Sequence, residues 1–189
     1  MSAEFDYAVS LLQENEEAWL IDDDTIRDGV FHGVLASFDK RPVNVFQVGA
    51  IESFAAQFRI GSGWSDIMFG KYIREHGGTL TVVDIDLDHL ANTALAAARL
   101  GYPLKISYGN AIHHIKEGYD IYYLDGADVP LGNAQTLEQF KKIENTKSVV
   151  LVDDIETKAV LLIEYLNEKH IDFVTHDVVG SGMITVDMR

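Results

Sequence analysis

From residue 43 onward, short apolar runs alternate with longer segments in which apolar residues follow a helical period. The runs are VNVFQVG, TLTVVDID, LKISYGN, YDIYYLDG and SVVLVDDI, which begin at residues 43, 79, 104, 119 and 148. The helical segments cover residues 65–76, 88–100, 135–143 and 156–170, and glycines follow the first two. Apolar strands that alternate with helices are typical of a parallel sheet covered on both faces. The pattern therefore predicts an α/β domain with a doubly wound sheet.

The C-terminal residues break this alternation. Two apolar runs, DFVTHDVV and MITVDM, are separated only by Gly180, Ser181 and Gly182. A glycine-rich connection this short joins the two strands of a hairpin. We therefore expect the last strand to run antiparallel to its neighbour.

The first 42 residues have a helical pattern. One helix is expected over residues 3–14, and a second begins after the three aspartates at 22–24, whose carboxylates can cap a helix. The second helix has one apolar face with a spacing of four residues, formed by Ile26, Val30, Val34 and Phe38. Such a face packs against the core or against a second copy of the chain. No linker or repeat divides the chain, so we expect one domain over 1–189, with a helical extension over 1–42 and the core over 43–189.

Composition narrows the classes of function. The chain has 189 residues, with 15 Lys and Arg against 30 Asp and Glu, and a formal net charge of -15. This acidity argues against nucleic acid and against an anionic membrane as partners, because both bind clustered Lys and Arg. The absence of cysteine excludes disulfides, thiolate metal ligands and a cysteine nucleophile. With no signal-peptide pattern and no long apolar run, we expect a cytoplasmic protein with a small-molecule partner.

The residues that follow the first two strands point to a cofactor that contains ribose. Gly49 and Ala50 follow the first strand, and a glycine-rich turn opens the next helix. This turn consists of Gly61, Ser62, Gly63, Trp64 and Ser65. Asp84 ends the second strand about twenty residues later, the interval at which an acidic residue accepts hydrogen bonds from ribose hydroxyls. Taken singly, each feature is also consistent with a plain turn or a helix cap.

Polar residues also follow the other strands. After the third strand, the amide of Asn110 can contact a purine edge or stabilise its own turn. The ends of the fourth and fifth strands carry Asp125, Asp128, Asp153 and Asp154. Several carboxylates at neighbouring strand ends repel one another unless a cation lies among them, and oxygen ligands of this kind suit Mg²⁺ or Ca²⁺. Some of these aspartates can instead cap the helices that follow.

A dinucleotide cofactor is disfavoured. Its fingerprint, G-x-G-x-x-G, needs a third glycine where the helix packs closely on the strand. Here Asp66 stands at that position, and its carboxylate would face the pyrophosphate. The antiparallel final strand also departs from the sheet of the dehydrogenases.

The segment GSGWSDIMFGKYIREHGGTLTVVDID, over residues 61–86, resembles the glycine motif, first helix and acidic second strand of class I S-adenosylmethionine-dependent methyltransferases. The resemblance continues through GNA, YYLDGAD and VVLVDDI to the C-terminal strand pair, and so covers residues 43–189. It implies a Rossmann-like, doubly wound, seven-stranded sheet in the order 3-2-1-4-5-7-6, with strand 7 antiparallel. The C-terminal hairpin inferred from the glycine-rich connection agrees with this order.

The resemblance also implies which residues hold S-adenosylmethionine. The turn at 61–65, with Gly49, would lie along the methionine part of the cofactor. Asp84 would hold the ribose hydroxyls, with Ile85 against the adenine and Asn110 near its edge. The expected cofactor-binding residues are Gly49, Ala50, Gly61, Ser62, Gly63, Trp64, Ser65, Asp84, Ile85, Asn110, Ala111 and Asp125.

Within this family, the YLDGAD and VDD segments are most similar to the cation-dependent O-methyltransferases that include catechol O-methyltransferase. The likeness implies a divalent metal, Mg²⁺ or Ca²⁺, on Asp125, Asp153 and Asp154. Two positions differ from that group: Asp154 stands where it has Asn, and no Lys follows Asp125 where it carries a catalytic base. Without a metal, Asp125 or Asp128 is the expected general base.

We therefore expect a methyltransferase that acts on an oxygen of a small molecule. Two alternatives stay open: a methyltransferase-like domain that binds a ligand or protein without catalysis, and a dinucleotide-dependent oxidoreductase. Further candidates for proton transfer are His113, His114 and His176. The expected partners are the small-molecule acceptor and a second copy of the chain, bound through the N-terminal helices.

Overall fold

The computed structural model of the protein describes residues 25–53, 65–126, 131–178 and 181–189, and within this part it leaves out the side chains of residues 25–28, 178 and 181. Some sequence predictions therefore lie outside the described residues. They are the helix over 3–14, the side chain of Ile26, the turn residues Gly61, Ser62, Gly63 and Trp64, and the candidate base Asp128.

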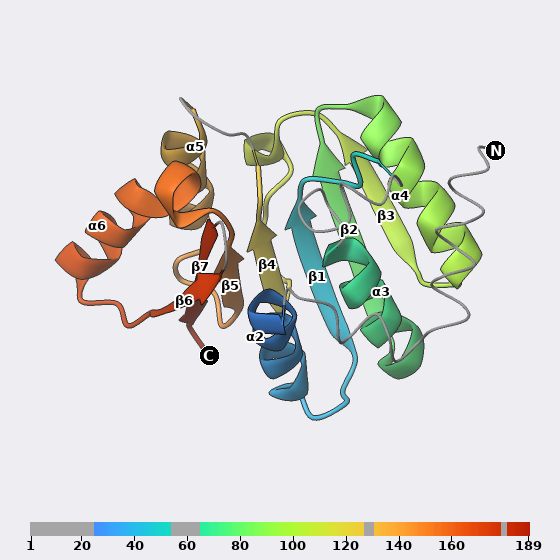
Figure 1. The fold of residues 1–189 in the computed structure, drawn as a ribbon, viewed down its shortest axis with the longest axis horizontal. Coiled ribbons are helices and arrows are strands. Elements are labelled where there is room, and N and C mark those ends of the chain that lie inside the picture. The colour runs from blue at the N-terminus through green and yellow to red at the C-terminus, as the bar shows by residue number, and fades with distance from the viewer. Residues whose placement is uncertain (1–24, 54–64, 127–130, 179–180) are drawn as a thin grey trace.

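A seven-stranded sheet with the order β3-β2-β1-β4-β5-β7-β6 forms the centre of the protein (Figure 1). The strands are β1 (Val43–Val48), β2 (Gly78–Asp84), β3 (Leu104–Tyr108), β4 (Ile121–Leu124), β5 (Val149–Val152), β6 (Val174–Val178) and β7 (Ser181–Asp187). The first five strands pair in parallel, and β7 runs antiparallel to both β5 and β6. The predicted strand order and antiparallel final strand are both confirmed.

The helices are α2 (Thr25–Ala36), α3 (Ser65–His76), α4 (Leu87–Leu100), α5 (Gly132–Lys141) and α6 (Val160–Lys169), with a short 3₁₀ helix η3 (Ala111–His113) and a π-helical turn η4 (Ile155–Ala159). Glycines end α3 and α4 as predicted: Gly101 has φ of 77° and its N–H donates to the Ala97 carbonyl. The segment expected as one helix over 156–170 instead starts with the π-helical turn. None of the helices in the described part of the chain is long and apolar enough to cross a membrane.

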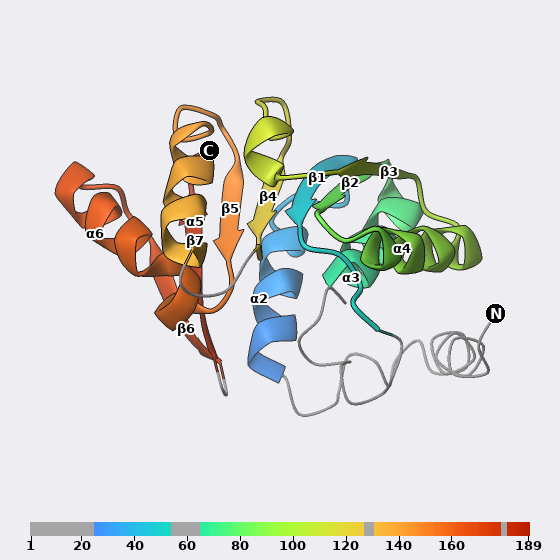
Figure 2. The ribbon, with the colours of Figure 1, turned by 90° about the horizontal axis from the view of Figure 1, so that it is seen from above.

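Each face of the sheet has its own core. Successive residues of a strand point to opposite faces, and the neighbours Tyr122 and Tyr123 illustrate this division. Tyr123 packs under α2 and α3, where its ring lies 5.3 Å from that of Phe31 and 6.0 Å from that of Phe69. Tyr122 belongs to the core under α5 and α6, with its ring 6.0 Å from that of Phe46. Figure 2 shows the same layered arrangement from above.

Helix α2 is part of the core of its own chain. Val30 and Phe38 of the predicted face are buried, and Val34 is partly buried. Phe31 and Leu35, which lie between the predicted positions, are buried as well. Of the two expected roles, this face therefore has the packing role, and a dimer contact through the N-terminal helices stays a prediction.

Gly49 allows the ends of β1 and β4 to approach each other closely. Its φ is +93°, and a Cβ built on it would lie 2.5 Å from the backbone oxygen of Asp125. Its N–H donates to the Val83 carbonyl over 3.0 Å, which fixes its height relative to β2. Only glycine combines this backbone angle with the absence of a side chain. Gly49 therefore allows the loop after β1 to lie directly against the backbone of Asp125 at the end of β4.

We expect Gly49→Ala to lower the free energy of unfolding by about 3 kcal/mol or more, because it combines backbone strain with a clash. Gly118→Ala is the matched control, since Gly118 has φ of +106° and nothing within 4 Å of a built Cβ. This control should cost only about 1 kcal/mol. Urea denaturation measures both values, and equal losses would contradict the close approach to Asp125.

A buried hydrogen-bond chain holds the loop after β1 against α3 and α4. The backbone N–H of Ile51 donates to Oγ1 of Thr93 over 3.0 Å, and this hydroxyl donates to Oδ2 of Asp66 over 2.8 Å. Asp66 has no exposed surface. Burial raises the pKa of Asp66 to about 8, although the hydrogen bond from Thr93 opposes the shift. Asp66 stands where the dinucleotide fingerprint needs a third glycine, and its carboxylate points inward to Thr93.

Asp66 makes stability depend on pH. Its pKa is raised in the folded protein, so between about pH 4 and 8 the folded state keeps a proton that the unfolded chain has lost. Stability from this group is therefore lost as pH rises through that window. We expect Asp66→Asn to gain stability relative to the native protein by up to about 1.4 kcal/mol per pH unit there.

Chemical denaturation at pH 5, 6, 7 and 8 measures this difference. Asp88→Asn, which changes an exposed aspartate of α4, is the control and should leave the pH dependence unchanged. Parallel stability curves for Asp66→Asn and the native protein would contradict the prediction.

Candidate functional site

Asp84, the last residue of β2, has a carboxylate that is oriented from both sides by backbone donors. Its Oδ2 accepts from the N–H of Ala50 over 2.9 Å, and its Oδ1 accepts from the N–H of Asp86 over 2.8 Å. Nδ1 of His89 lies 3.6 Å from the same Oδ2. A carboxylate oxygen accepts more than one hydrogen bond, so this fixed group has acceptor capacity for a pair of hydroxyls.

The surroundings of Asp84 include exposed apolar side chains. Ile85, the next residue, is 67% exposed, and Tyr108, which pairs with Asp84 across β2 and β3, is 61% exposed. Exposed apolar groups beside a fixed carboxylate suit a planar base attached to a sugar. Ile85 was predicted from the sequence. Tyr108 was missed, and its position at the end of an apolar run was the only signal for it.

Asn110 has the structural role that the sequence analysis left open. Its Oδ1 accepts from the N–H of Ile112 over 3.0 Å and so caps η3. The next residue, Ala111, is buried. The side-chain amide of Asn110 also has an NH₂ group, which can donate to a ligand while the side-chain oxygen caps the turn.

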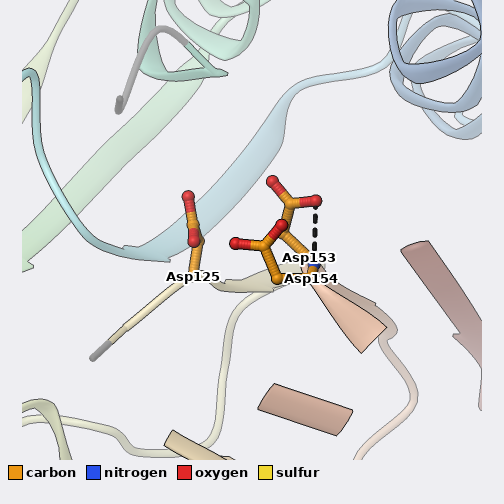
Figure 3. A group of neighbouring side chains, drawn as sticks. All are labelled: Asp125, Asp153 and Asp154. Carbon is orange, nitrogen blue, oxygen red and sulfur yellow. Dashed lines mark hydrogen bonds between the residues drawn. The ribbon is translucent and has the colours of Figure 1, made fainter. Parts of the chain in front are cut away.

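Three carboxylates come together where β4 and β5 end. One oxygen from each of Asp125, Asp153 and Asp154 lies within 4.8 Å of the others. Figure 3 shows the three side chains directed into a common space from the two neighbouring strand ends. Asp153 is 1% exposed and accepts from its neighbour's N–H, that of Asp154, over 3.0 Å. The predicted convergence of these residues is confirmed.

Tyr123, whose ring is buried in the core, donates a hydrogen bond to this cluster. Its hydroxyl lies 2.9 Å from Oδ2 of Asp153 and 3.2 Å from Oδ2 of Asp125. One hydroxyl carries one proton, so the two carboxylates share this donor. The buried aromatic layer of the core thereby reaches the polar strand ends.

Lys158 is the functional candidate that sequence reasoning missed. Its Nζ lies 2.5 Å from Oδ1 of Asp125 and 2.9 Å from Oδ2 of Asp154, and the residue is 4% exposed. Burial alone would lower the pKa of Lys158, but the attraction and hydrogen bonds of the two carboxylates outweigh it. The net pKa is raised, and the side chain is a permanent cation. A Lys four residues after Asp154 was the available signal.

The backbone after β5 brings Lys158 back to the strand ends. Asp154 adopts a left-handed conformation, with φ of 53°, and the π-helical turn η4 follows. The N–H groups of Thr157 and Lys158 donate to the Asp154 carbonyl over 3.0 and 2.8 Å. The side chain of Asn133 on α5 donates to the Thr157 carbonyl over 2.9 Å. Turns of this kind occur preferentially at functional sites.

The three carboxylates, with Lys158 among them, do not fit the predicted divalent metal. Asp125, Asp153 and Asp154 are the right ligand type for Mg²⁺ or Ca²⁺. The ammonium of Lys158, however, already bridges two of the three carboxylates. A second cation in the same space would be repelled and would lose those two ligands.

His176 lies away from these strand ends. It is in the middle of β6, where it pairs with Met183, and its Nε2 lies 3.0 Å from Oγ1 of Thr185. Burial lowers the pKa of His176. This position gives His176 a role in the β6–β7 pair. His113 and His114 lie at the end of η3, and their predicted part in proton transfer stays a prediction.

Comparison with known proteins supports the fold. No family model matches the sequence, and no curated protein matches it. A methyltransferase from Geobacter sulfurreducens matches with a TM-score of 0.60 at 11% identity, over 100% of this chain and 91% of that one. An O-methyltransferase from Bacillus cereus in complex with SAH matches with a TM-score of 0.56 at 11% identity, over 99% and 91% of the two chains.

An RNA methyltransferase from Salinibacter ruber, in complex with S-adenosyl-L-homocysteine, matches with a TM-score of 0.54 at 14% identity, over 85% of this chain and 90% of that one. At such low identity these matches concern the fold alone. Together with the strand order β3-β2-β1-β4-β5-β7-β6, they show that the protein has the Rossmann-like fold of the class I methyltransferases.

Proposed function

We propose that the protein is an S-adenosylmethionine-dependent methyltransferase that transfers a methyl group to an oxygen of a small molecule. The observation that carries the proposal is the carboxylate of Asp84, held at the end of β2 by the N–H groups of Ala50 and Asp86. Such a fixed carboxylate suits the two hydroxyls of a ribose. The solved structures with SAH or S-adenosyl-L-homocysteine bound to the same fold support this assignment.

The described residues around Asp84 fit this cofactor. The hydroxyl of Ser65 and Oε1 of Gln47 are buried polar atoms with no hydrogen-bond partner among the described residues. In our proposal, Asp84 holds the ribose, Ile85 covers the adenine and Asn110 donates to its edge. Gly49, Ala50 and Ser65 border the methionine part.

The cofactor supplies a methyl group on a sulfonium, and the chain supplies alignment and charge. Transfer is an in-line displacement, so the acceptor oxygen must be held opposite the leaving sulfur. The cluster at the ends of β4 and β5 has three carboxylates against one ammonium. This excess of negative charge stabilises a cation nearby, and Asp125 or Asp128 is the expected acceptor of the proton from the substrate hydroxyl.

Two other functions remain as outcomes of the tests. A dinucleotide-dependent oxidoreductase is disfavoured by β7, which runs antiparallel between β5 and β6. A methyltransferase-like domain without catalysis would bind the cofactor and transfer nothing. The acceptor class is also open to test, since the proteins of this fold include an O-methyltransferase and an RNA methyltransferase.

Titration calorimetry with S-adenosylhomocysteine and with NAD tests the cofactor. We expect binding of S-adenosylhomocysteine and none of NAD. Asp84→Asn should weaken the binding by about 10- to 100-fold, because hydrogen bonds to a charged group contribute about 1.5–3 kcal/mol. Asp88→Asn, on the exposed face of α4, is the matched control and should bind as the native protein does. Unchanged affinity of Asp84→Asn would contradict the role of Asp84.

Turnover of S-adenosylmethionine with a labelled methyl group tests catalysis. We expect transfer to at least one member of a panel of hydroxyl and carboxyl acceptors, because the strand-end carboxylates can accept a proton. The measurement is the label recovered in each acceptor. Cofactor binding without transfer to any acceptor would favour the domain without catalysis.

A further inference from the structure

We propose that the ammonium of Lys158 is a built-in cation that takes the place of a divalent metal among Asp125, Asp153 and Asp154. The site then needs no metal, and Lys158 acts as a positioning residue that holds Asp125 in place. The inference concerns the cation of the strand-end cluster and stands on its own geometry. Only its turnover measurement rests on the proposed function.

Lys158 occupies the space that a metal ion would need. One oxygen from each of the three carboxylates lies within 4.8 Å of the others, a separation at which they could hold a metal ion. Mg²⁺ needs oxygens at about 2.0–2.1 Å and Ca²⁺ at about 2.3–2.6 Å. The Nζ of Lys158 lies 2.5 Å from Asp125 and 2.9 Å from Asp154, so the ammonium fills the position that the ion would take.

Lys158 also supplies positive charge and hydrogen bonds to the cluster. Three carboxylates so close together need positive charge or donors among them. Lys158 supplies two charge-assisted hydrogen bonds, to Asp125 and Asp154. The third carboxylate, Asp153, accepts from the hydroxyl of Tyr123 and from the N–H of Asp154. Each of the three carboxylates therefore accepts a hydrogen bond from another group of the same chain.

The backbone holds Lys158 in this position. The π-helical turn that carries it is tied to α5 by Asn133, whose side chain donates to the Thr157 carbonyl. On its other side, Ile155 packs against β7 so closely that a Cβ on Gly182 would lie 2.6 Å from it. With 4% of Lys158 exposed, the side chain is embedded along its length. Its placement is a consequence of packing rather than of a mobile surface lysine.

Removal of the ammonium should turn the cluster into a metal site. In Lys158→Ala, three carboxylates remain within ligand distance of one another, and the ammonium that offsets part of their charge is gone. A divalent cation relieves that repulsion and binds the folded state only, so it stabilises the protein. Lys158→Met keeps most of the side-chain volume while it removes the charge, and serves as a second variant if the alanine variant does not fold.

The experiment measures thermal unfolding and calorimetric binding with MnCl₂, MgCl₂ and CaCl₂, and with EDTA. For the native protein we expect no shift of Tm and no binding. For Lys158→Ala or Lys158→Met we expect a lower Tm in EDTA and a rise of about 5 °C with saturating Mn²⁺. Lys147→Ala, which removes an exposed lysine, is the control and should behave as the native protein does. Asp154→Asn added to the Lys158 variant should abolish the gain.

Saturable Mn²⁺ or Mg²⁺ binding by the native protein would overturn the inference, as would loss of its methyl transfer in EDTA. So would a folded Lys158 variant that gains no metal affinity. These failures are distinguishable from failure of the proposed function. A native protein that binds both S-adenosylhomocysteine and metal contradicts only the inference, and one that binds neither contradicts only the cofactor assignment.

Discussion

The convergence of parallel strands on one edge of the sheet is the constraint on which the rest of the structure depends. Because β1, β2, β4 and β5 are parallel, their carboxyl ends meet there, and the loops that leave them carry the polar side chains. The edge is crowded, since Gly49 approaches the backbone of Asp125 with no room for a side chain. Carboxylates that gather there repel one another unless donors or cations lie among them. Each carboxylate is therefore stabilised in place, Asp84 by backbone donors and Asp125 by a lysine.

Most of the fold could be predicted from the sequence, because buried parallel strands and glycine helix ends leave local patterns. The features that escaped prediction depend on geometry or on distant residues. Lys158 was overlooked because residues 156–170 were expected to form one regular helix, whereas the left-handed Asp154 and a π-helical turn redirect the chain. From the sequence, Asp66 is only the residue that replaces the third fingerprint glycine, and its buried partner Thr93 lies 27 residues later on α4. No local pattern indicates such a partner.

The carboxyl ends of β1, β2 and β3 and those of β4 and β5 carry different kinds of side chain. The ends of β1, β2 and β3 carry Gly49, Asp84 and Asn110, which suit a nucleoside. The ends of β4 and β5 carry the ionic cluster with Lys158, which under the proposed function would border the acceptor. Chains that share this fold at 11–14% identity include an O-methyltransferase and an RNA methyltransferase. The same fold therefore occurs in proteins named for different acceptors.

Tyr123 joins the packing of α2 to the polar edge of the sheet. Its ring lies against Phe31 of α2, and its hydroxyl reaches both Asp153 and Asp125. One side chain therefore takes part both in the packing of α2 and in the hydrogen bonds of the carboxylate cluster. The helix before the first strand is thus mechanically coupled to the ionic cluster.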